Sequence, residues 1–168
     1  MNVAILTVSD RSAAGDREDV SGLLIKERIE AHGWQVQFYS IVPDEGSEIE
    51  KYLIQWSDSG EVDLILTTGG TGFSPRDITP ESTLSVIERN VPGIPEVLRQ
   101  EGLKKSPYAM LSRAVAGIRG KTIIVNLPGN PKAVKESLPV LLPVIPHAIK
   151  LLAGDPDSHE LPRNMPTT

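Results

Sequence analysis

The sequence predicts a single α/β domain of three layers, built on a mainly parallel, mixed sheet. Short apolar runs typical of buried strands alternate along the chain with longer segments in which apolar residues recur at helical spacing. Turn residues separate these segments, and neither an internal repeat nor a linker interrupts the alternation. A chain of 168 residues with 39% hydrophobic residues is also large enough to form one domain with a sizeable core.

Four strands are predicted from apolar runs. They cover residues 2–8, 35–41, 62–67 and 120–126. Three of them are rich in Val, Ile and Leu, which is typical of buried parallel strands. The second alternates polar and apolar residues, as a half-exposed strand does, and this alternation places Val36 and Phe38 on one face.

Helices are predicted between the strands from helical spacing and from capping residues. They cover residues 21–32, 48–57, 80–89, 96–104 and 108–115. Ser47 is the expected N-cap of the second helix. Thr79 is the expected N-cap of the third, with Pro80 at its first helical position.

A last apolar stripe at helical spacing begins after Lys132 and reaches Leu152. Pro139, Pro143 and Pro146 lie inside it. Each proline removes a backbone donor and costs ~3 kcal/mol in a helix interior, so we expect a kink or two shorter helices. Residues 1–153 are therefore predicted as the domain, and the Pro-rich, polar residues 154–168 as a flexible tail.

Composition excludes several classes of protein. The chain contains no cysteine, which excludes disulfides and thiolate metal sites and points to a reducing compartment. The net charge of -5 argues against a generic nucleic-acid-binding protein, although a locally positive pocket could still bind an anion. The N-terminal apolar run is too short to span a bilayer and lacks the basic start of a signal peptide, so we expect a cytoplasmic protein without a membrane partner.

The third predicted strand leads into a turn, T-T-G-G-T-G, that is almost free of side chains. Gly69, Gly70 and Gly72 can adopt positive φ angles and allow a ligand to approach the backbone closely. Successive N–H groups in such a turn form an anion-binding concavity. Arg76 and Asp77 then add one cation and one carboxylate. The spacing matches neither the P-loop nor the dinucleotide fingerprint, and the alternative is a tight turn without a ligand.

Right-handed crossovers place the carboxyl ends of parallel strands at one edge of a sheet, where ligands bind in such folds. The four loops expected to converge there begin at Ser9, Val42, Thr67 and Leu127. Asp44 and Asp77 both lie just beyond a strand end, and two carboxylates that face a phosphate favour a divalent cation such as Mg²⁺ between them. The alternative is structural: Asp44 caps the next helix or turn, and Asp77 pairs with Arg76 or acts as a cap.

Other polar residues of these loops are candidates for phosphate contacts. The basic candidates are Arg11, Arg76, Arg113 and Lys132. The hydroxyl and carboxylate candidates are Ser9, Asp10, Thr71, Ser74 and Ser112. For the first group the common alternative is a solvated surface side chain, and for the second it is turn capping.

Five motifs follow one another along the chain. They read V-S-D-R-S-A-A-G with D-V-S-G, V-P-D-E, T-T-G-G-T-G-F-S-P-R-D-I-T-P-E, L-S-R-A-V-A-G and N-L-P-G-N-P-K-A-V. Together they resemble the MoaB/Mog family of molybdenum cofactor biosynthesis proteins. The resemblance extends to about Leu152, and the long glycine-containing motif is its most specific part.

The resemblance implies a MoaB/Mog-like three-layer fold, usually a homotrimer, that uses Mg²⁺ and ATP to adenylylate molybdopterin and releases pyrophosphate. The two functional aspartates of the family correspond to Asp44 and Asp77, which would be catalytic and hold the metal. The pterin and phosphate pocket would comprise Ser9, Asp10, Gly69, Gly70, Thr71, Gly72, Ser74, Arg76, Ser112, Pro128, Gly129, Asn130 and Lys132. A molybdopterin carrier without catalytic activity and a generic nucleotide-binding domain are the alternatives.

Overall fold

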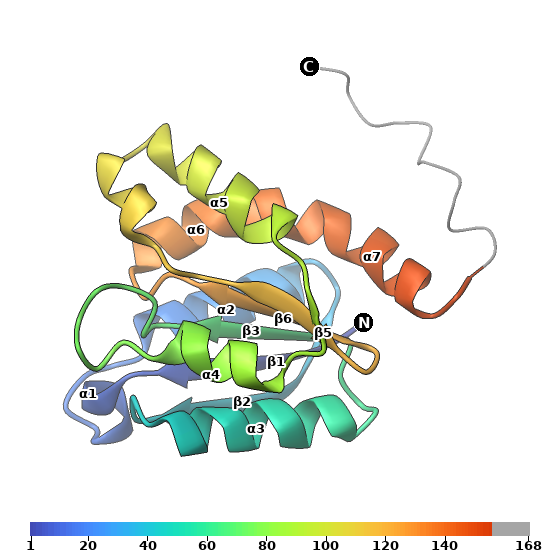
Figure 1. Ribbon diagram of the computed structural model, residues 1–168, viewed down its shortest axis with the longest axis horizontal. Coiled ribbons are helices and arrows are strands. Elements are labelled where there is room, and N and C mark those ends of the chain that lie inside the picture. Colours follow the sequence, from blue (N-terminus) through green and yellow to red (C-terminus); the bar gives the residue numbers. More distant parts are fainter. Residues whose placement is uncertain (156–168) are drawn as a thin grey trace.

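The computed structural model describes residues 1–155 and contains a six-stranded mixed sheet with helices on both faces (Figure 1). The strands are β1 (Asn2–Val8), β2 (Gln35–Val42), β3 (Leu64–Thr68), β4 (Arg89–Asn90), β5 (Ala116–Arg119) and β6 (Thr122–Leu127), in the order β2-β1-β3-β6-β5-β4. The pairings of β1 with β2, β1 with β3 and β3 with β6 are parallel, whereas β4 and β5 extend the sheet in antiparallel fashion. The predicted mainly parallel, mixed sheet is therefore confirmed.

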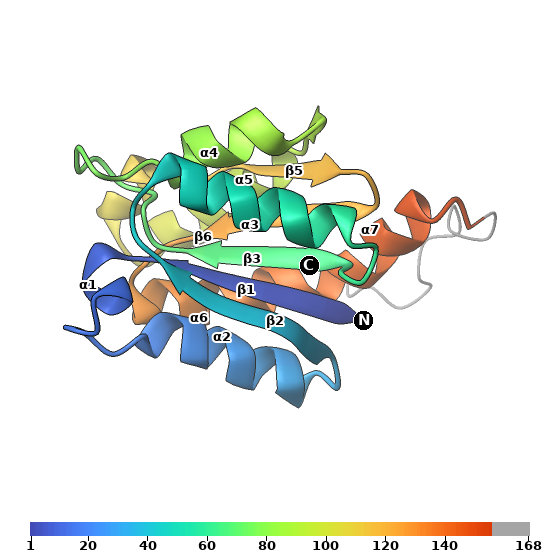
Figure 2. The same cartoon turned by 90° about the horizontal axis from the view of Figure 1, so that it is seen from below.

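The helices form one layer on each side of the sheet (Figure 2). The first layer contains α2 (Val20–Ala31), α5 (Gly93–Leu103), α6 (Pro131–Leu141) and α7 (Ile145–Leu152), and the second contains α3 (Gly46–Asp58) and α4 (Thr79–Val86). The short helix α1 (Asp10–Ala13) follows β1 at the edge of the sheet. Three layers are thus present, as the alternation of strands and helices predicts.

Each face of the sheet has its own apolar core. Fully buried Ile25, Ile29 and Val134 pack with β1, β3 and β6 in the first core. Ile49, Leu53 and Trp56, the regular stripe of α3, fill the second. The central strands are buried along nearly their whole length because both faces are covered.

The bulge in the pairing of β1 and β2 corrects the predicted faces of β2. The register shifts between Val3 and Ala4, so that one extra residue of β2 lies between Val36 and Phe38. Val36 packs against the first core and Phe38 stacks on Trp56 in the second. The prediction that Val36 and Phe38 share a face is wrong because a bulge inverts the alternation.

Two predicted helix caps are also wrong. Thr79 is the first residue of α4, with Ile78 in the cap position, and its hydroxyl donates instead to the backbone carbonyl of Gly69 at 2.9 Å. Ser47 lies inside α3, whose cap residue Glu45 makes no side-chain capping bond. The hydroxyl of Thr79 is thereby used to hold the glycine turn.

The region between α5 and β6 differs most from the prediction. Residues 108–115 do not form an α-helix; a 3₁₀ turn covers Pro107–Leu111, and β5 follows. The predicted strand at residues 120–126 is the second half of a hairpin, in which Gly120 takes a positive φ of 55° in the turn. The strands β4 and β5, of two and four residues, are too short to produce a clear periodic pattern.

The interrupted C-terminal helix is confirmed. α6 ends at Leu141, a 3₁₀ turn covers Leu142–Val144, and α7 begins at Ile145. Pro143 lies in the 3₁₀ turn and Pro146 in the first turn of α7, where a missing donor costs little. Of the predicted tail, residues 156–168 lie outside the described residues. Within residues 1–155, no helix has the length and apolar character needed to cross a bilayer.

Candidate functional site

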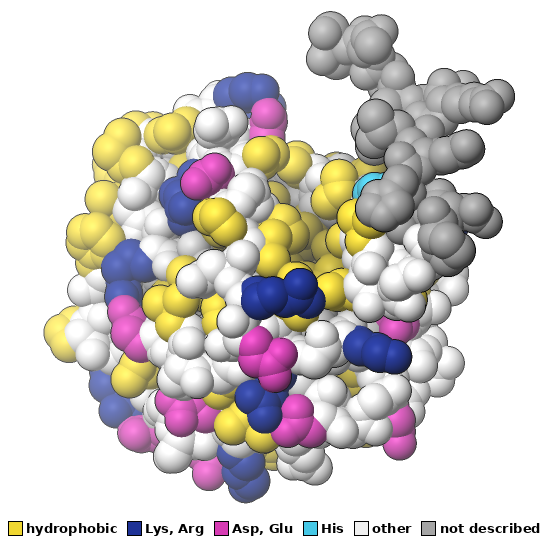
Figure 3. All heavy atoms as spheres, turned by 45° about the vertical axis from the view of Figure 1, so that its right-hand side comes forward, with side chains coloured by type: hydrophobic (Ala, Val, Ile, Leu, Met, Phe, Trp, Pro, Cys, Tyr) yellow, Lys and Arg dark blue, Asp and Glu magenta, His cyan; other side chains and the backbone are white. Residues whose placement is uncertain are grey.

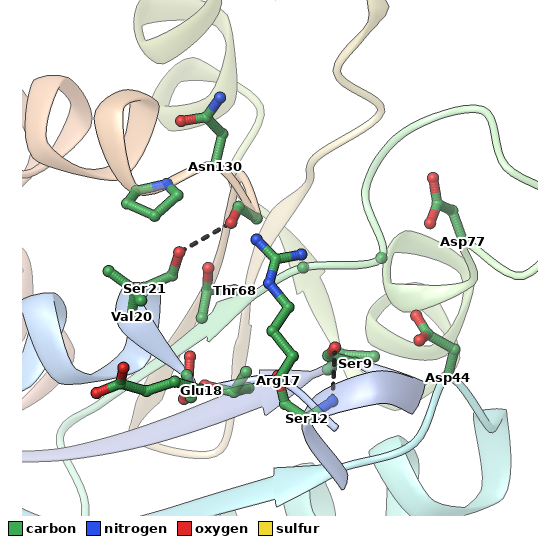
Figure 4. Close-up of a pocket in the computed structure, with 17 residues that line it drawn as sticks. Ser9, Ser12, Arg17, Glu18, Val20, Ser21, Asp44, Thr68, Asp77 and Asn130 are labelled. Carbon is green, nitrogen blue, oxygen red and sulfur yellow. Dashed lines mark hydrogen bonds between the residues drawn. The ribbon is translucent and has the colours of Figure 1, made fainter. Parts of the chain in front are cut away.

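A hollow of about 460 Å³, called the main hollow below, lies at the edge where the parallel strands end (Figure 4). The loops after β1, β2, β3 and β6 all contribute to it, as the strand-end rule predicts. Its lining residues are Thr7, Val8, Ser9, Ser12, Arg17, Glu18, Asp19, Val20, Ser21, Asp44, Thr68, Gly69, Gly70, Asp77, Gly129, Asn130 and Pro131. Asp44 and Asp77 therefore share one cavity.

The glycine turn forms the floor between these loops because it packs too closely for side chains. Gly69 has φ +97°, and a Cβ there would lie 2.2 Å from the carbonyl oxygen of Val8. Gly70 has φ +62°, and its Cβ would lie 2.4 Å from the hydroxyl of Thr79. Only glycine therefore allows the backbone of this turn to lie against β1 and α4 while it lines the hollow.

The turn after β6 is joined to the glycine turn. The hydroxyl of Thr68 donates to the carbonyl of Pro128 at 2.7 Å, and the hydroxyl of Ser21 donates to the carbonyl of Gly129 at 2.8 Å. Asn130 caps α6 by accepting from the backbone N–H of Lys132 at 2.9 Å. These bonds hold the starts of α2 and α6 beside the end of β3.

Asp44 is fixed by its neighbour Asp10. The backbone N–H of Asp10 donates to the Asp44 carboxylate at 2.8 Å, and the backbone N–H of Asp44 donates to the Asp10 carboxylate at 3.0 Å. Burial raises the pKa of Asp44, and the negative charges of Asp10 and Asp77 add to that effect. The carboxylate of Asp44 thus lies in the field of Asp77, where a bound cation would relieve the repulsion.

Arg76 is already paired with carboxylates. Its guanidinium donates to both oxygens of Asp10 at 2.9 and 3.0 Å, and to Glu45 at 2.8 Å. This bidentate bond is the main reason why the pKa of Asp10 lies below its usual value. Arg76 and Asp10 do not line the main hollow but hold the loops after β1, β2 and β3 together. A direct phosphate contact of Arg76 stays a prediction.

Arg113 is also committed, to the loop that carries Asp77. Its guanidinium donates to the backbone carbonyls of Gly72 and Asp77, both at 2.7 Å, and it pairs with Glu81. The Asp77 carboxylate in turn accepts from the backbone N–H of Ser74 at 3.0 Å. Arg113, a candidate phosphate partner by sequence, is used to shape this loop.

A second hollow of about 450 Å³ receives most of the other predicted site residues. From the predicted set it contains Thr71, Gly72, Ser112, Pro128, Asn130 and Lys132. The glycine turn and the turn after β6 contribute to both hollows, and Asn130 lines each of them. Ser74 and Arg11 line neither hollow. The structure thus distributes the predicted pocket over two adjoining cavities.

The wall formed by the loop before α2 is a part of the site that the sequence does not predict. The buried carboxylate of Asp19 accepts from the hydroxyls of Thr7 and Tyr39 and from the backbone N–H of Gly22. Burial raises the pKa of Tyr39, with the Asp19 hydrogen bond as a further cause. The D-V-S-G motif that begins at Asp19 is the available signal, whereas no local pattern marks Arg17.

The residues present restrict the kind of metal site. In residues 1–155 no group of three or more His, Cys, Asp or Glu side chains is arranged to hold a metal ion. Two carboxylates beside a phosphate-sized cavity suit Mg²⁺, which commonly takes one or two carboxylates and completes its shell with phosphate oxygens and water. The pair Asp44 and Asp77 fits that requirement.

Comparisons with known proteins agree with this geometry. Residues 4–147 match the family model MoCF_biosynth, described as "Probable molybdopterin binding domain". The chain is 43% identical over 157 residues to a molybdopterin adenylyltransferase of Helicobacter pylori, covering 92% of this chain and 89% of the relative. It is 39% identical over 141 residues to the molybdopterin adenylyltransferase of Escherichia coli K12, covering 82% and 72%.

Solved structures show the same fold. The crystal structure of the molybdopterin biosynthesis enzyme MoaB from Thermus thermophilus matches with a TM-score of 0.85 and 51% sequence identity. That match covers 92% of this chain and 98% of the other.

Proposed function

Because this chain belongs to the family of molybdopterin-binding domains that its residues 4–147 match, we propose that it is a molybdopterin adenylyltransferase of molybdenum cofactor biosynthesis. One observation carries the proposal: Asp44 and Asp77 line a single hollow together with the glycine turn. Two acids that can share a cation, beside amides that can hold an anion, are the parts that phosphoryl chemistry requires.

The reaction joins molybdopterin to the adenylyl group of ATP. An oxygen of the terminal phosphate of molybdopterin attacks the α-phosphorus of ATP, and pyrophosphate leaves with the electron pair of the broken P–O bond. A phosphate oxygen is already ionised at neutral pH, so the step needs no strong base. Catalysis is then mainly positioning and neutralisation of charge.

Residues of the hollow divide these tasks. Backbone N–H groups of Gly69–Gly72 would hold a phosphate, and Asp44 and Asp77 would hold Mg²⁺. When bound, Mg²⁺ neutralises charge on the phosphate oxygens and polarises the phosphoryl group. Lys132, from the second hollow, steadies further negative charge, and Arg76 adds its positive charge from outside the main hollow while it stays bonded to Asp10 and Glu45. Two adjoining cavities of about 460 and 450 Å³ give room for two substrates on either side of the joined turns.

The assembly and compartment belong to the same proposal. We place the protein in the cytoplasm as a homotrimer. A groove of about 330 Å³ between α5 and α6, lined by Val91, Gly93, Ile94, Val97, Leu98, Val140, Leu141 and Val144, supports an apolar subunit contact. Figure 3 shows hydrophobic side chains in the upper part of one face, with charged side chains among and below them. Light scattering of the purified chain tests the trimer.

One assay separates this function from its alternatives. The protein is mixed with molybdopterin, ATP and Mg²⁺, and adenylylated pterin and pyrophosphate are measured. We expect both products in equal amounts and none when Mg²⁺ is chelated. Retention of the pterin without product would identify a carrier, and binding of ATP alone would identify a generic nucleotide-binding domain.

A further inference from the structure

The main hollow is rich in negative charge, although its proposed ligands are anions. Four carboxylates line it, from Glu18, Asp19, Asp44 and Asp77. Arg17 is the one basic residue among its lining residues. Even with Mg²⁺ between two of the carboxylates, a phosphate in this cavity would gain from a further positive charge, because unscreened charges interact over several ångströms in a partly buried site.

Three other arginines, Arg76, Arg113 and Arg99, are not available without breaking existing bonds, and Arg11 lines neither hollow. Arg76 holds Asp10 and Glu45, and Arg113 holds two backbone carbonyls and Glu81. Arg99 donates to the backbone carbonyls of Ser112 and Ala114 and lines neither hollow. Recruiting any of them for a phosphate would cost the contacts that shape the loops.

Arg17 has no such commitment. Within residues 1–155 its guanidinium makes no hydrogen bond or ion pair. Figure 4 shows its side chain extending across the pocket, from the side of Ser9 and Ser12 toward the loop that carries Asn130, with Asp44 and Asp77 farther to one side. It is therefore a charged side chain directed into the cavity but unused by the protein itself.

The backbone that carries Arg17 is held on both sides. Ser9 caps α1 by accepting from the backbone N–H of Ser12 at 3.2 Å. The backbone N–H of Asp16 donates to the carbonyl of Arg11 at 2.9 Å. On the other side, Asp19 is buried and bonded to Thr7 and Tyr39. Ligand binding would thus restrict mainly the Arg17 side chain, since the segment behind it is already ordered.

We propose that Arg17 binds a phosphate group of the substrate in the main hollow. The guanidinium fork matches two phosphate oxygens at once and keeps its charge at all relevant pH values. The phosphate is either part of the triphosphate of ATP or the terminal phosphate of molybdopterin, which share this chemistry. This inference rests on the proposed function for its substrates, and it adds a residue that the motifs do not mark.

The test compares Arg17→Gln with Arg28→Gln. Arg28 is exposed near the other end of α2, lines neither hollow, and makes no side-chain hydrogen bond or ion pair with the described residues, so the control removes the same charge. KM and kcat are measured for ATP and for molybdopterin, and calorimetry measures binding of Mg-ATP, pyrophosphate and molybdopterin. Arg17→Lys keeps the charge but loses the fork.

We expect Arg17→Gln to raise the KM of one substrate by about tenfold, the size of one lost charge-assisted contact to a phosphate, with a smaller change in kcat. Arg28→Gln should behave like the unmodified protein, and Arg17→Lys should lie between. A raised KM for ATP together with weaker pyrophosphate binding would show that Arg17 contacts the triphosphate of ATP. A raised KM for molybdopterin alone assigns the terminal phosphate of the pterin.

The inference is overturned if Arg17→Gln and Arg28→Gln match in both KM values and in all three binding constants. Its failure is distinct from failure of the proposed function. If the unmodified protein forms no adenylylated pterin, the function is wrong, and the binding measurements still decide whether Arg17 contacts a phosphate. Because the Arg17 side chain makes no hydrogen bond or ion pair within residues 1–155, the variant should retain the fold, and circular dichroism checks this.

Discussion

The two sides of the main hollow differ in how firmly the protein holds the charged side chains that face it. On the acidic side, Asp10 and Asp44 bond each other reciprocally, and Arg76 ties them to a third loop. On the opposite side, the loop before α2 contributes Arg17, whose side chain is unpaired within residues 1–155, and α2 contributes its half-exposed first residue, Val20. There a hydrogen bond from Ser21 is what joins α2 to the turn after β6.

The difference separates two requirements of a group-transfer site. Groups that neutralise charge in a transition state act best when they are placed before the substrate arrives, because no reorganisation is then needed during the reaction. Groups that recognise a substrate can be ordered by the substrate itself, at a cost in side-chain entropy. We expect substitutions on the acidic side to lower turnover, and substitutions on the opposite side to change binding.

Replacement of Asp77 by Asn should have the largest effect. The amide keeps an oxygen to accept from Ser74 but loses the charge that would hold Mg²⁺. We expect turnover to fall at least about a hundredfold, as when a group that stabilises transition-state charge is removed, with molybdopterin binding largely intact. Initial rates and calorimetric binding constants measure the two effects. Undiminished adenylylation by Asp77→Asn would refute the role assigned to Asp77.

Gly69→Ala should show that the glycine turn, which lies between the two sides of the main hollow, requires close contact with the backbone of β1. Its Cβ would meet the Val8 carbonyl at 2.2 Å in addition to the strain of φ +97°. Gly60 has φ +72° with nothing within 4 Å, so Gly60→Ala measures the strain alone. We expect a loss of about 1 kcal/mol in unfolding free energy for Gly60→Ala and more than about 2 kcal/mol for Gly69→Ala. Equal losses in chemical denaturation would show that the contact with Val8 is unimportant.

Arg113→Lys should weaken the acidic side without removing a charge. Lysine cannot donate to the carbonyls of Gly72 and Asp77 in the geometry of a guanidinium fork, so the Asp77 loop loses its support. We expect kcat to fall about tenfold, a typical cost for loss of a charge-assisted hydrogen bond, while both KM values change little.

The matched control for that substitution is Arg119→Lys. Arg119 makes a comparable set of bonds, to Asp58 and to the carbonyl of Val86, away from the hollow. Turnover of the control should stay normal even if its stability falls. A similar loss of turnover in both variants would indicate a general effect on the fold instead of support for Asp77.

Of the substitutions considered, Asp44→Asn should change the stability of the fold least, and it should increase that stability. Because the folded protein raises the pKa of Asp44, ionised Asp44 destabilises the fold at neutral pH. In the absence of Mg²⁺, we expect the variant to melt at a higher temperature than the original protein at pH 7. Turnover should fall at least about a hundredfold, as in Asp77→Asn.

The sign of this effect can be checked with pH. As the pH falls through the raised pKa, Asp44 takes up a proton in the folded state before it does so in the unfolded state, and the original protein gains stability. The difference in Tm between the two proteins should therefore shrink in acid. A difference that grows in acid would contradict the assigned shift.

Sequence reasoning succeeds here where the structure depends on local features of the chain, such as a proline or an apolar run. Pro143 and Pro146 lie at the break between α6 and α7, and the helix is interrupted as predicted, although Pro139 lies inside α6 without ending it. The parallel strands are recognisable because burial on both faces leaves long apolar runs. Their order along the chain then places Asp44 and Asp77 at one edge, where the two residues share a cavity.

Sequence reasoning fails where the role of a side chain depends on a partner that is distant in the sequence. Thr79 has the sequence pattern of a cap, but its hydroxyl bonds Gly69, ten residues earlier in the chain. Arg76 and Arg113 resemble free cations in the sequence, whereas the fold brings carboxylates and carbonyls to them. Arg17, in contrast, stays unpaired in the described structure, and a lone arginine in a polar loop carries no sequence signal for that difference.

The brevity of β4 also affects how this molecule meets its neighbours. A long open border strand offers a ladder of backbone donors and acceptors to which a foreign strand can add, and such addition leads to aggregation. At this border the ladder consists of Arg89 and Asn90, both exposed and polar, and the backbone then enters α5. An incoming strand would find few sites for pairing there, which protects the protein against fibre-like growth from that side of the sheet.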